Sequence, residues 1–93
     1  MIWVDELRQW PTEIRCFQSG ACHLTSSTHD LDELHAFARR IGMRRSWFQD
    51  HRRLPHYDLT PERRQRAIEL GAVFVPYREQ KRLRNAANTG VST

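Results

Sequence analysis

Residues 30–42, DLDELHAFARRIG, hold the clearest secondary-structure signal in the chain. Asp30 has the character of an N-cap, and Glu33 follows three residues later in a capping-box pattern. Apolar side chains recur at helical spacing along one stripe, namely Leu31, Leu34, Phe37, Ala38 and Ile41. Gly42 suits the position just beyond a helix end. The stretch therefore predicts an amphipathic helix that packs one face against a core.

Short apolar segments alternate with further helical patterns on either side of this helix. Residues 1–4, 44–49 and 72–75 predict strands, the first and last of them buried. A short hairpin, or a loop leading into one strand, is expected within residues 16–24. Helices are expected at residues 60–70, where Thr60 caps and Pro61 begins the first turn, and at residues 77–87. This order predicts a small α/β domain of two or three layers. Its sheet is expected to be mainly parallel, with three to four short strands, alongside three helices.

The length and composition limit the class of protein. The 93 residues suffice for one domain, so we expect a single α/β domain at residues 1–87 and a disordered tail at residues 88–93. The mean hydropathy is −0.75 and no apolar run approaches the roughly 20 residues of a membrane span, so no membrane partner is expected. The first residues lack the pattern of a signal peptide, which favours a cytoplasmic protein. The net charge of +4 suits contact with nucleic acid or another polyanion.

Polar side chains follow the predicted strands and concentrate in one loop. Ligands of open α/β sheets bind where the strands end, so parallel strands would gather these side chains at one edge. The candidate catalytic residues are Asp5, His23, His35, Asp50, His56, Tyr57 and Asp58. For His35 the alternative is a histidine at the border of the core, and for the loop around His56 it is a solvated surface.

Imidazole and carboxylate groups are ordinary ligands of divalent metal ions, and histidine also titrates near neutral pH. The sequence therefore leaves open a metal centre or a metal-free acid–base site. The candidate metal ligands are Asp5, His23, His56 and Asp58, and the candidate phosphate-binding residues are Arg52, Arg53 and Arg78. Tyr57 or Arg53 would stabilise charge that develops on the substrate.

Several of these residues also carry a family resemblance. The strand ending at Asp5, the helix 31–38 and the His56-Tyr57-Asp58 run ahead of Gly71-Ala72-Val73 resemble DUF4031, a small bacterial and bacteriophage domain of unknown function. The resemblance spans most of the chain and implies no established activity.

Two classes of function are compatible with this pattern. The first is a small hydrolase of phosphate esters, acting on a nucleotide or nucleic acid through the His/Asp residues. The alternative is a non-catalytic, basic accessory protein that binds nucleic acid, or a phage-type protein that binds a host target.

Overall fold

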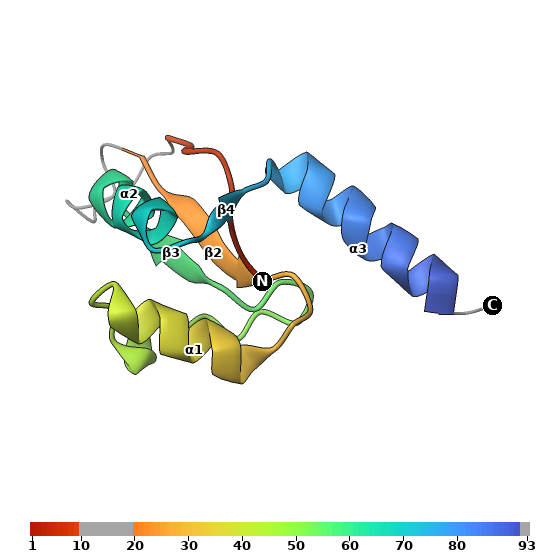
Figure 1. Ribbon diagram of the computed structural model, residues 1–93, viewed down its shortest axis with the longest axis horizontal. Coiled ribbons are helices and arrows are strands. Elements are labelled where there is room, and N and C mark those ends of the chain that lie inside the picture. The colour runs from red at the N-terminus through yellow and green to blue at the C-terminus, as the bar shows by residue number, and fades with distance from the viewer. Residues whose placement is uncertain (10–19, 92–93) are drawn as a thin grey trace.

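The computed structural model describes residues 1–9 and 20–91, which form a mixed sheet and three α-helices (Figure 1). In chain order the elements are β1 (Ile2–Val4), β2 (Cys22–Ser26), α1 (Leu31–Arg40), the 3-10 helix η2 (Arg45–Trp47), β3 (Tyr57–Leu59), α2 (Pro61–Glu69), β4 (Val73–Phe74) and α3 (Tyr77–Val91). The α/β class expected from the sequence is confirmed.

The direction of the sheet differs from the expectation. The strand order is β3-β2-β1-β4, and β1–β2 and β2–β3 are antiparallel pairs. Among the described strands only β1 and β4 run parallel, so the predicted mainly parallel sheet is wrong. The reason is that β2 pairs antiparallel with β1, and β3, absent from the predicted elements, pairs directly back onto β2.

The pleat of β1, β2 and β3 directs apolar side chains to one face of the sheet and leaves the other face for polar ones. Successive strand residues point to opposite faces, so each strand contributes alternate residues to the core. The core face carries Ile2, Val4, Cys22, Leu24, Tyr57 and Leu59, all less than 9% exposed. Leu34 and Phe37 of α1 and Ala67 of α2 complete the apolar cluster on this side. The opposite face of the same strands is therefore available for polar side chains.

The third helix packs against that opposite face. Gln80 of α3 is fully buried and accepts a hydrogen bond from the hydroxyl of Thr25 on β2, at 3.2 Å. One turn further, the Arg84 guanidinium lies 5.2 Å from the ring centre of Trp3 on β1. Beyond these contacts α3 extends away from the sheet, which gives the molecule its long axis of 46 Å (Figure 1).

The predicted starts of α1 and α2 and the glycine just beyond α1 are confirmed, whereas α3 continues to Val91, past its expected end at residue 87. The Asp30 carboxylate accepts a hydrogen bond from the Glu33 amide at 3.1 Å, and the Thr60 hydroxyl accepts one from the Arg63 amide at 3.3 Å. Gly42 has φ of 83°, a left-handed conformation that favours glycine just beyond a helix.

Three strand predictions have other outcomes. Residues 44–49 form η2 rather than a strand, and Trp47 is exposed beside the guanidinium groups of Arg44 and Arg63. The last strand, β4, is an exposed edge rather than a buried strand, with Phe74 49% exposed. Cys22 to Leu24 of the expected hairpin lie in β2, whereas Cys16 and Phe17 lie outside the described residues. In the described part of the chain, no helix has the length and apolar character needed to cross a membrane.

Candidate functional site

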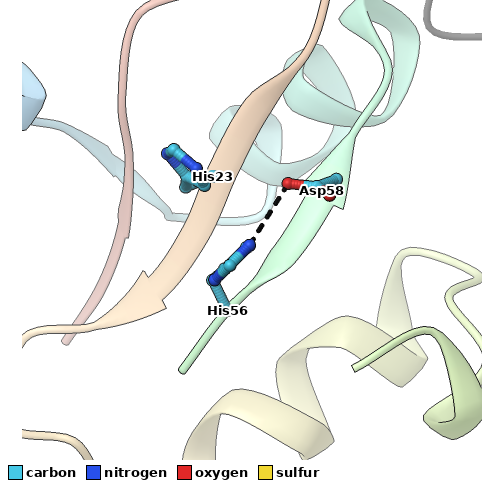
Figure 2. A group of neighbouring side chains, drawn as sticks. All are labelled: His23, His56 and Asp58. Carbon is cyan, nitrogen blue, oxygen red and sulfur yellow. Dashed lines mark ion pairs between the residues drawn. The ribbon is translucent and has the colours of Figure 1, made fainter. Parts of the chain in front are cut away.

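A row of three polar side chains crosses the face of the sheet opposite the core. In the β2–β3 register His23 lies directly opposite Asp58, and the β1–β2 register continues past Val4 to bring Asp5 beside His23. His56 lies two residues before Asp58 and shares its face (Figure 2). The strands β1, β2 and β3 thus bring Asp5, His23, His56 and Asp58 together by alternation of side chains on one face, with Asp5 directly after β1 and His56 directly before β3.

Asp5 fixes the orientation of the His23 imidazole. Its side chain is fully buried, and its two oxygens accept hydrogen bonds from the His23 amide at 2.6 Å and from the His23 Nδ1 at 2.7 Å. The Arg64 Nε donates to the Asp5 carbonyl oxygen at 3.0 Å and ties the end of β1 to α2. Because Nδ1 donates to a carboxylate, the neutral ring keeps its lone pair at Nε2.

His56 is held in the same tautomer by a different acceptor. Its Nδ1 lies 2.6 Å from the Leu54 carbonyl oxygen, which can only accept, so Nδ1 carries the proton. The two imidazole rings of His23 and His56 meet edge to face, with centroids 4.7 Å apart. The His56 Nε2 then faces the Asp58 Oδ1 at 3.4 Å, the pair drawn as a dashed line in Figure 2.

This pair requires a positive charge between its two atoms. With Nδ1 protonated, a neutral His56 would direct the Nε2 lone pair at a carboxylate oxygen, which is repulsive. Burial opposes protonation of His56, but the hydrogen bonds with Asp58 and Leu54 outweigh burial and raise the pKa of His56 above 6.5. Burial also acts to raise the pKa of Asp58, yet the bond with His56 outweighs it and lowers that pKa. A proton or a metal ion between His56 Nε2 and Asp58 Oδ1 can therefore offset the negative charge of the Asp58 carboxylate.

The geometry also suits a metal ion. One ligand atom from each of His23, His56 and Asp58 can be chosen so that all three lie within 4.8 Å of one another. Two imidazoles and one carboxylate are a donor set typical of divalent transition metals with open coordination positions. Asp5 would act on such an ion through His23, because a carboxylate bonded to the distal ring nitrogen orients a ligating histidine.

A cleft of about 840 Å³ opens over His23 and His56. Its charged lining consists of the cationic residues Arg8, Arg53, Lys81 and Arg84. The histidines of the lining are His23, His29, His51 and His56. None of the described lining residues carries a carboxylate, and Tyr77 provides an aromatic ring. The described lining of the cleft is therefore positively charged.

A small network positions Arg8 at the cleft. Glu6 accepts a hydrogen bond from Arg8 at 2.5 Å and another from the Tyr77 amide at 3.2 Å, at the first residue of α3. The Arg8 guanidinium carbon lies 4.9 Å from the centre of the Tyr77 ring. The carboxylate of Glu6 thus joins the segment after β1 to the start of α3, where a negative charge is favourable.

Other candidate residues lie elsewhere. Tyr57 is on the core face, where its hydroxyl bonds the His35 Nδ1 at 2.8 Å, and the His35 ring packs edge to face on Phe48. Burial lowers the pKa of His35 and raises that of Tyr57. The structure therefore does not bring His35 and Tyr57 to the cleft. They form a separate pair on the other side of the sheet.

The loop residues divide between the cleft and the open surface. Arg53 lines the cleft, whereas Arg52 and Arg78 are exposed and are not among its described lining residues. Asp50 is also exposed and lies outside the His23–His56–Asp58 group.

Sequence reasoning did not single out three contributors to the site. Gln49 donates a hydrogen bond to the Asp58 Oδ2, Arg8 joins the network around Tyr77, and Gln80 anchors α3. The first of these depends on a bridge between Gln49 and His56 that leaves no trace in the sequence. The spacing of His56 and Asp58 was a usable signal, because residues two apart in a strand share a face.

Comparison with known proteins supports the family resemblance. Residues 2–87 match the family described as "Protein of unknown function (DUF4031)". Neither the curated proteins nor the solved structures gave a match. The match covers nearly the whole chain, and the protein therefore belongs to the DUF4031 family.

Proposed function

We propose that this protein is a phosphoester hydrolase that uses a divalent metal ion and acts on a nucleotide or a nucleic acid. One observation carries the proposal: His23 and His56, whose Nδ1 atoms are hydrogen-bonded to oxygens, gather with Asp58, and both histidines line a cationic cleft. The proposed metal ligands are His23, His56 and Asp58, and Asp5 orients His23.

The positions of the hydrogen bonds favour metal binding over a purely structural cluster. Each histidine already directs its Nδ1 proton to an oxygen, so Nε2 is the ring atom that each would offer to a metal ion, which would take the place of the proton between His56 and Asp58. Gln49 donates to the second oxygen of Asp58, which leaves Oδ1 on the side of His56. A divalent ion at such a position polarises a phosphoryl oxygen and lowers the pKa of bound water.

The cleft supports a phosphate ester as the substrate. Arg8 and Arg53 lie in the same lining as His23 and His56 and provide positive charge for a phosphate group. Arginine is suited to this role because its guanidinium forms paired hydrogen bonds with phosphate oxygens.

The reaction needs only water as co-reactant. A water oxygen forms a bond to phosphorus and gives up one proton, the bond from phosphorus to the leaving oxygen breaks, and the leaving oxygen takes up one proton, so that water is added across the bond. A diester then yields a phosphomonoester and an alcohol. Within the protein, His23, His56 and Asp58 hold the ion, while Arg8 and Arg53 stabilise charge on the phosphoryl oxygens.

A second candidate function is non-catalytic binding of nucleic acid. The cationic lining of the cleft favours it independently of the His/Asp group. It predicts affinity for nucleic acid that persists in the presence of a chelator, together with no hydrolysis under any metal condition.

The test is hydrolysis of bis(4-nitrophenyl) phosphate and of a labelled oligonucleotide by the full chain with Zn²⁺ or Mn²⁺. We expect His56→Asn and Asp58→Asn to lower the rate by about 100-fold or more, because a metal contributes several kcal/mol to such reactions. The matched controls are His35→Asn and Asp32→Asn, whose side chains lie outside the cleft lining. Equal rates in all four variants and the wild type, or no metal-dependent hydrolysis at all, would contradict the proposal.

A further inference from the structure

The helix α3 runs alongside β2 and forms one wall of the cleft. At its start, the Tyr77 ring centroid lies 6.0 Å from that of His23. One turn later, Gln80 bonds Thr25, and a further turn on, the Arg84 Nη2 donates to the Ser26 carbonyl oxygen at 3.2 Å. The helix and the strand therefore advance together, from the His/Asp cluster toward the far end of β2.

The length of this wall follows from both elements. From Tyr77 to Arg84 the helix rises seven residues, or about 10 Å at 1.5 Å per residue. From His23 to Ser26 the strand advances three residues, which is also about 10 Å. Arg84 thus lies about 10 Å along the helix from Tyr77, the residue beside His23, and Lys81 lies about 6 Å along it.

The far end carries its own positive charge. Lys81 and Arg84 lie on the side of α3 that lines the cleft, and His29 joins them from the loop before α1. Arg84 is packed over Trp3 and uses one guanidinium nitrogen on Ser26, while its buried Nε has no hydrogen-bond partner among the described residues. No carboxylate among the described lining residues offsets these charges. A group of cations without an acidic partner in the lining favours an anion at this end as well.

We propose that Lys81 and Arg84 form a second phosphate subsite, so that the cleft takes single-stranded nucleic acid rather than a mononucleotide. The identity of the bond that is cleaved rests on the proposed hydrolase function, but the binding of a strand does not. One phosphate lies at His23 and His56, and the phosphate of a neighbouring nucleotide lies at Lys81 and Arg84.

The size of the cleft supports a single strand. Its volume of about 840 Å³ is in the upper part of the range for small-molecule sites, which suits a segment of a few nucleotides. A duplex is too wide to enter a cleft between one helix and one strand. Tyr77 lines the cleft beside His23, with the Arg8 guanidinium close to its ring, and aromatic side chains in this kind of place stack on bases in single-strand binding sites.

The test is binding of 5′-labelled oligothymidylates of increasing length to the full chain, measured by fluorescence anisotropy in the presence of a chelator. We expect the affinity to rise from the mononucleotide to the dinucleotide and longer strands. In Lys81→Gln/Arg84→Gln, we expect the affinity for strands to fall by about tenfold or more and the mononucleotide affinity to change little. The slope of log affinity against log salt should fall by about 0.7, since the variant loses one phosphate contact and each single-strand phosphate contact contributes roughly 0.7.

The matched control is Arg66→Gln/Arg82→Gln, which removes the same net charge from exposed arginines paired with Glu69 and Glu79 outside the cleft lining. We expect it to bind strands nearly as the wild type does. Because Arg84 also packs on Trp3, Lys81→Gln alone serves as a variant at an exposed position that leaves this contact intact.

The outcomes separate this inference from the proposed function. Affinity independent of strand length, or an equal loss in the control, would overturn the second subsite even if the protein hydrolyses phosphate esters. Length-dependent binding that is lost with Lys81 and Arg84 would support it even if no hydrolysis is found.

Discussion

Asp5→Asn provides a direct test of how the site is held together. The substitution keeps the size of the side chain but replaces one carboxylate oxygen by an NH₂ group. Asp5 now accepts from both the His23 amide and the His23 Nδ1, at 2.6 and 2.7 Å. Asparagine can accept only one of these bonds, so one buried donor of His23 would meet another donor.

The expected magnitude follows from these two bonds. A hydrogen bond to a charged group contributes about 1.5–3 kcal/mol, so loss of one should lower the free energy of unfolding by about 2–3 kcal/mol. Because the His23 ring also loses its fixed tautomer, we expect the affinity for Zn²⁺ to fall by about 10–100-fold.

Two measurements check this prediction. Urea unfolding, followed by tryptophan fluorescence in the presence of a chelator, gives the change in stability, and calorimetric titration with Zn²⁺ gives the change in affinity. Asp32→Asn, at an exposed position on α1, is the matched control and should change neither quantity. An Asp5→Asn variant with wild-type stability and wild-type zinc affinity would refute the role assigned to Asp5.

Three further predictions concern the anchor of α3, the ion pair and the buried thiol. Gln80→Ala should lower the free energy of unfolding by about 1–3 kcal/mol, seen in urea unfolding, and increase hydrogen exchange at the start of α3, because a fully buried amide that bridges helix and sheet is lost. In chelated protein, the stabilising effect of the His56–Asp58 pair should be greatest between pH 3.8 and 6.5. His56, whose pKa is raised above 6.5, loses its contribution as pH rises through the raised value, and Asp58, whose pKa is lowered below 3.8, loses its contribution as pH falls through the lowered value. Urea unfolding of wild type and Asp58→Asn across this range measures the effect, and a difference that grows above neutral pH would contradict it. Burial raises the pKa of Cys22 from 9.0 to about 12, so at neutral pH its thiolate fraction should be about 1,000-fold lower than that of an ordinary thiol. In a Cys16→Ser background, we therefore expect Cys22 to react slowly with a disulfide reagent until the protein unfolds.

The helices were predictable because their signals are local. The Asp30 cap, the apolar stripe through Leu34 and the glycine at position 42 all lie within one segment, and each predicts the same helix. The direction of the sheet was not predictable in this way, because strand pairing depends on residues far apart in the chain. The aromatic pair Trp47-Phe48 suggested a strand, yet Trp47 lies on the surface with Arg44 and Arg63 close to its ring, so it needs no sheet to cover it.

Part of the candidate site could be predicted from the sequence, although these residues meet for a different reason than the common edge of a parallel sheet. Asp5, His23, His56 and Asp58 lie together because alternate residues of antiparallel strands share a face, and not because parallel strands end at one edge. The same alternation places Tyr57 between His56 and Asp58 on the core face. Contacts such as that of Gln49 with Asp58 depend on loop conformation, which a single sequence does not reveal.

The most direct test of the proposed metal centre is binding of Co²⁺ to the full chain, measured by visible absorption and by calorimetry. We expect one ion per chain, with a spectrum typical of nitrogen and oxygen ligands. His23→Asn, His56→Asn and Asp58→Asn should each abolish that spectrum, while His35→Asn should retain it. An ion bound equally well by all four variants, or no saturable binding by the wild type, would contradict the claim that these three side chains form a metal centre.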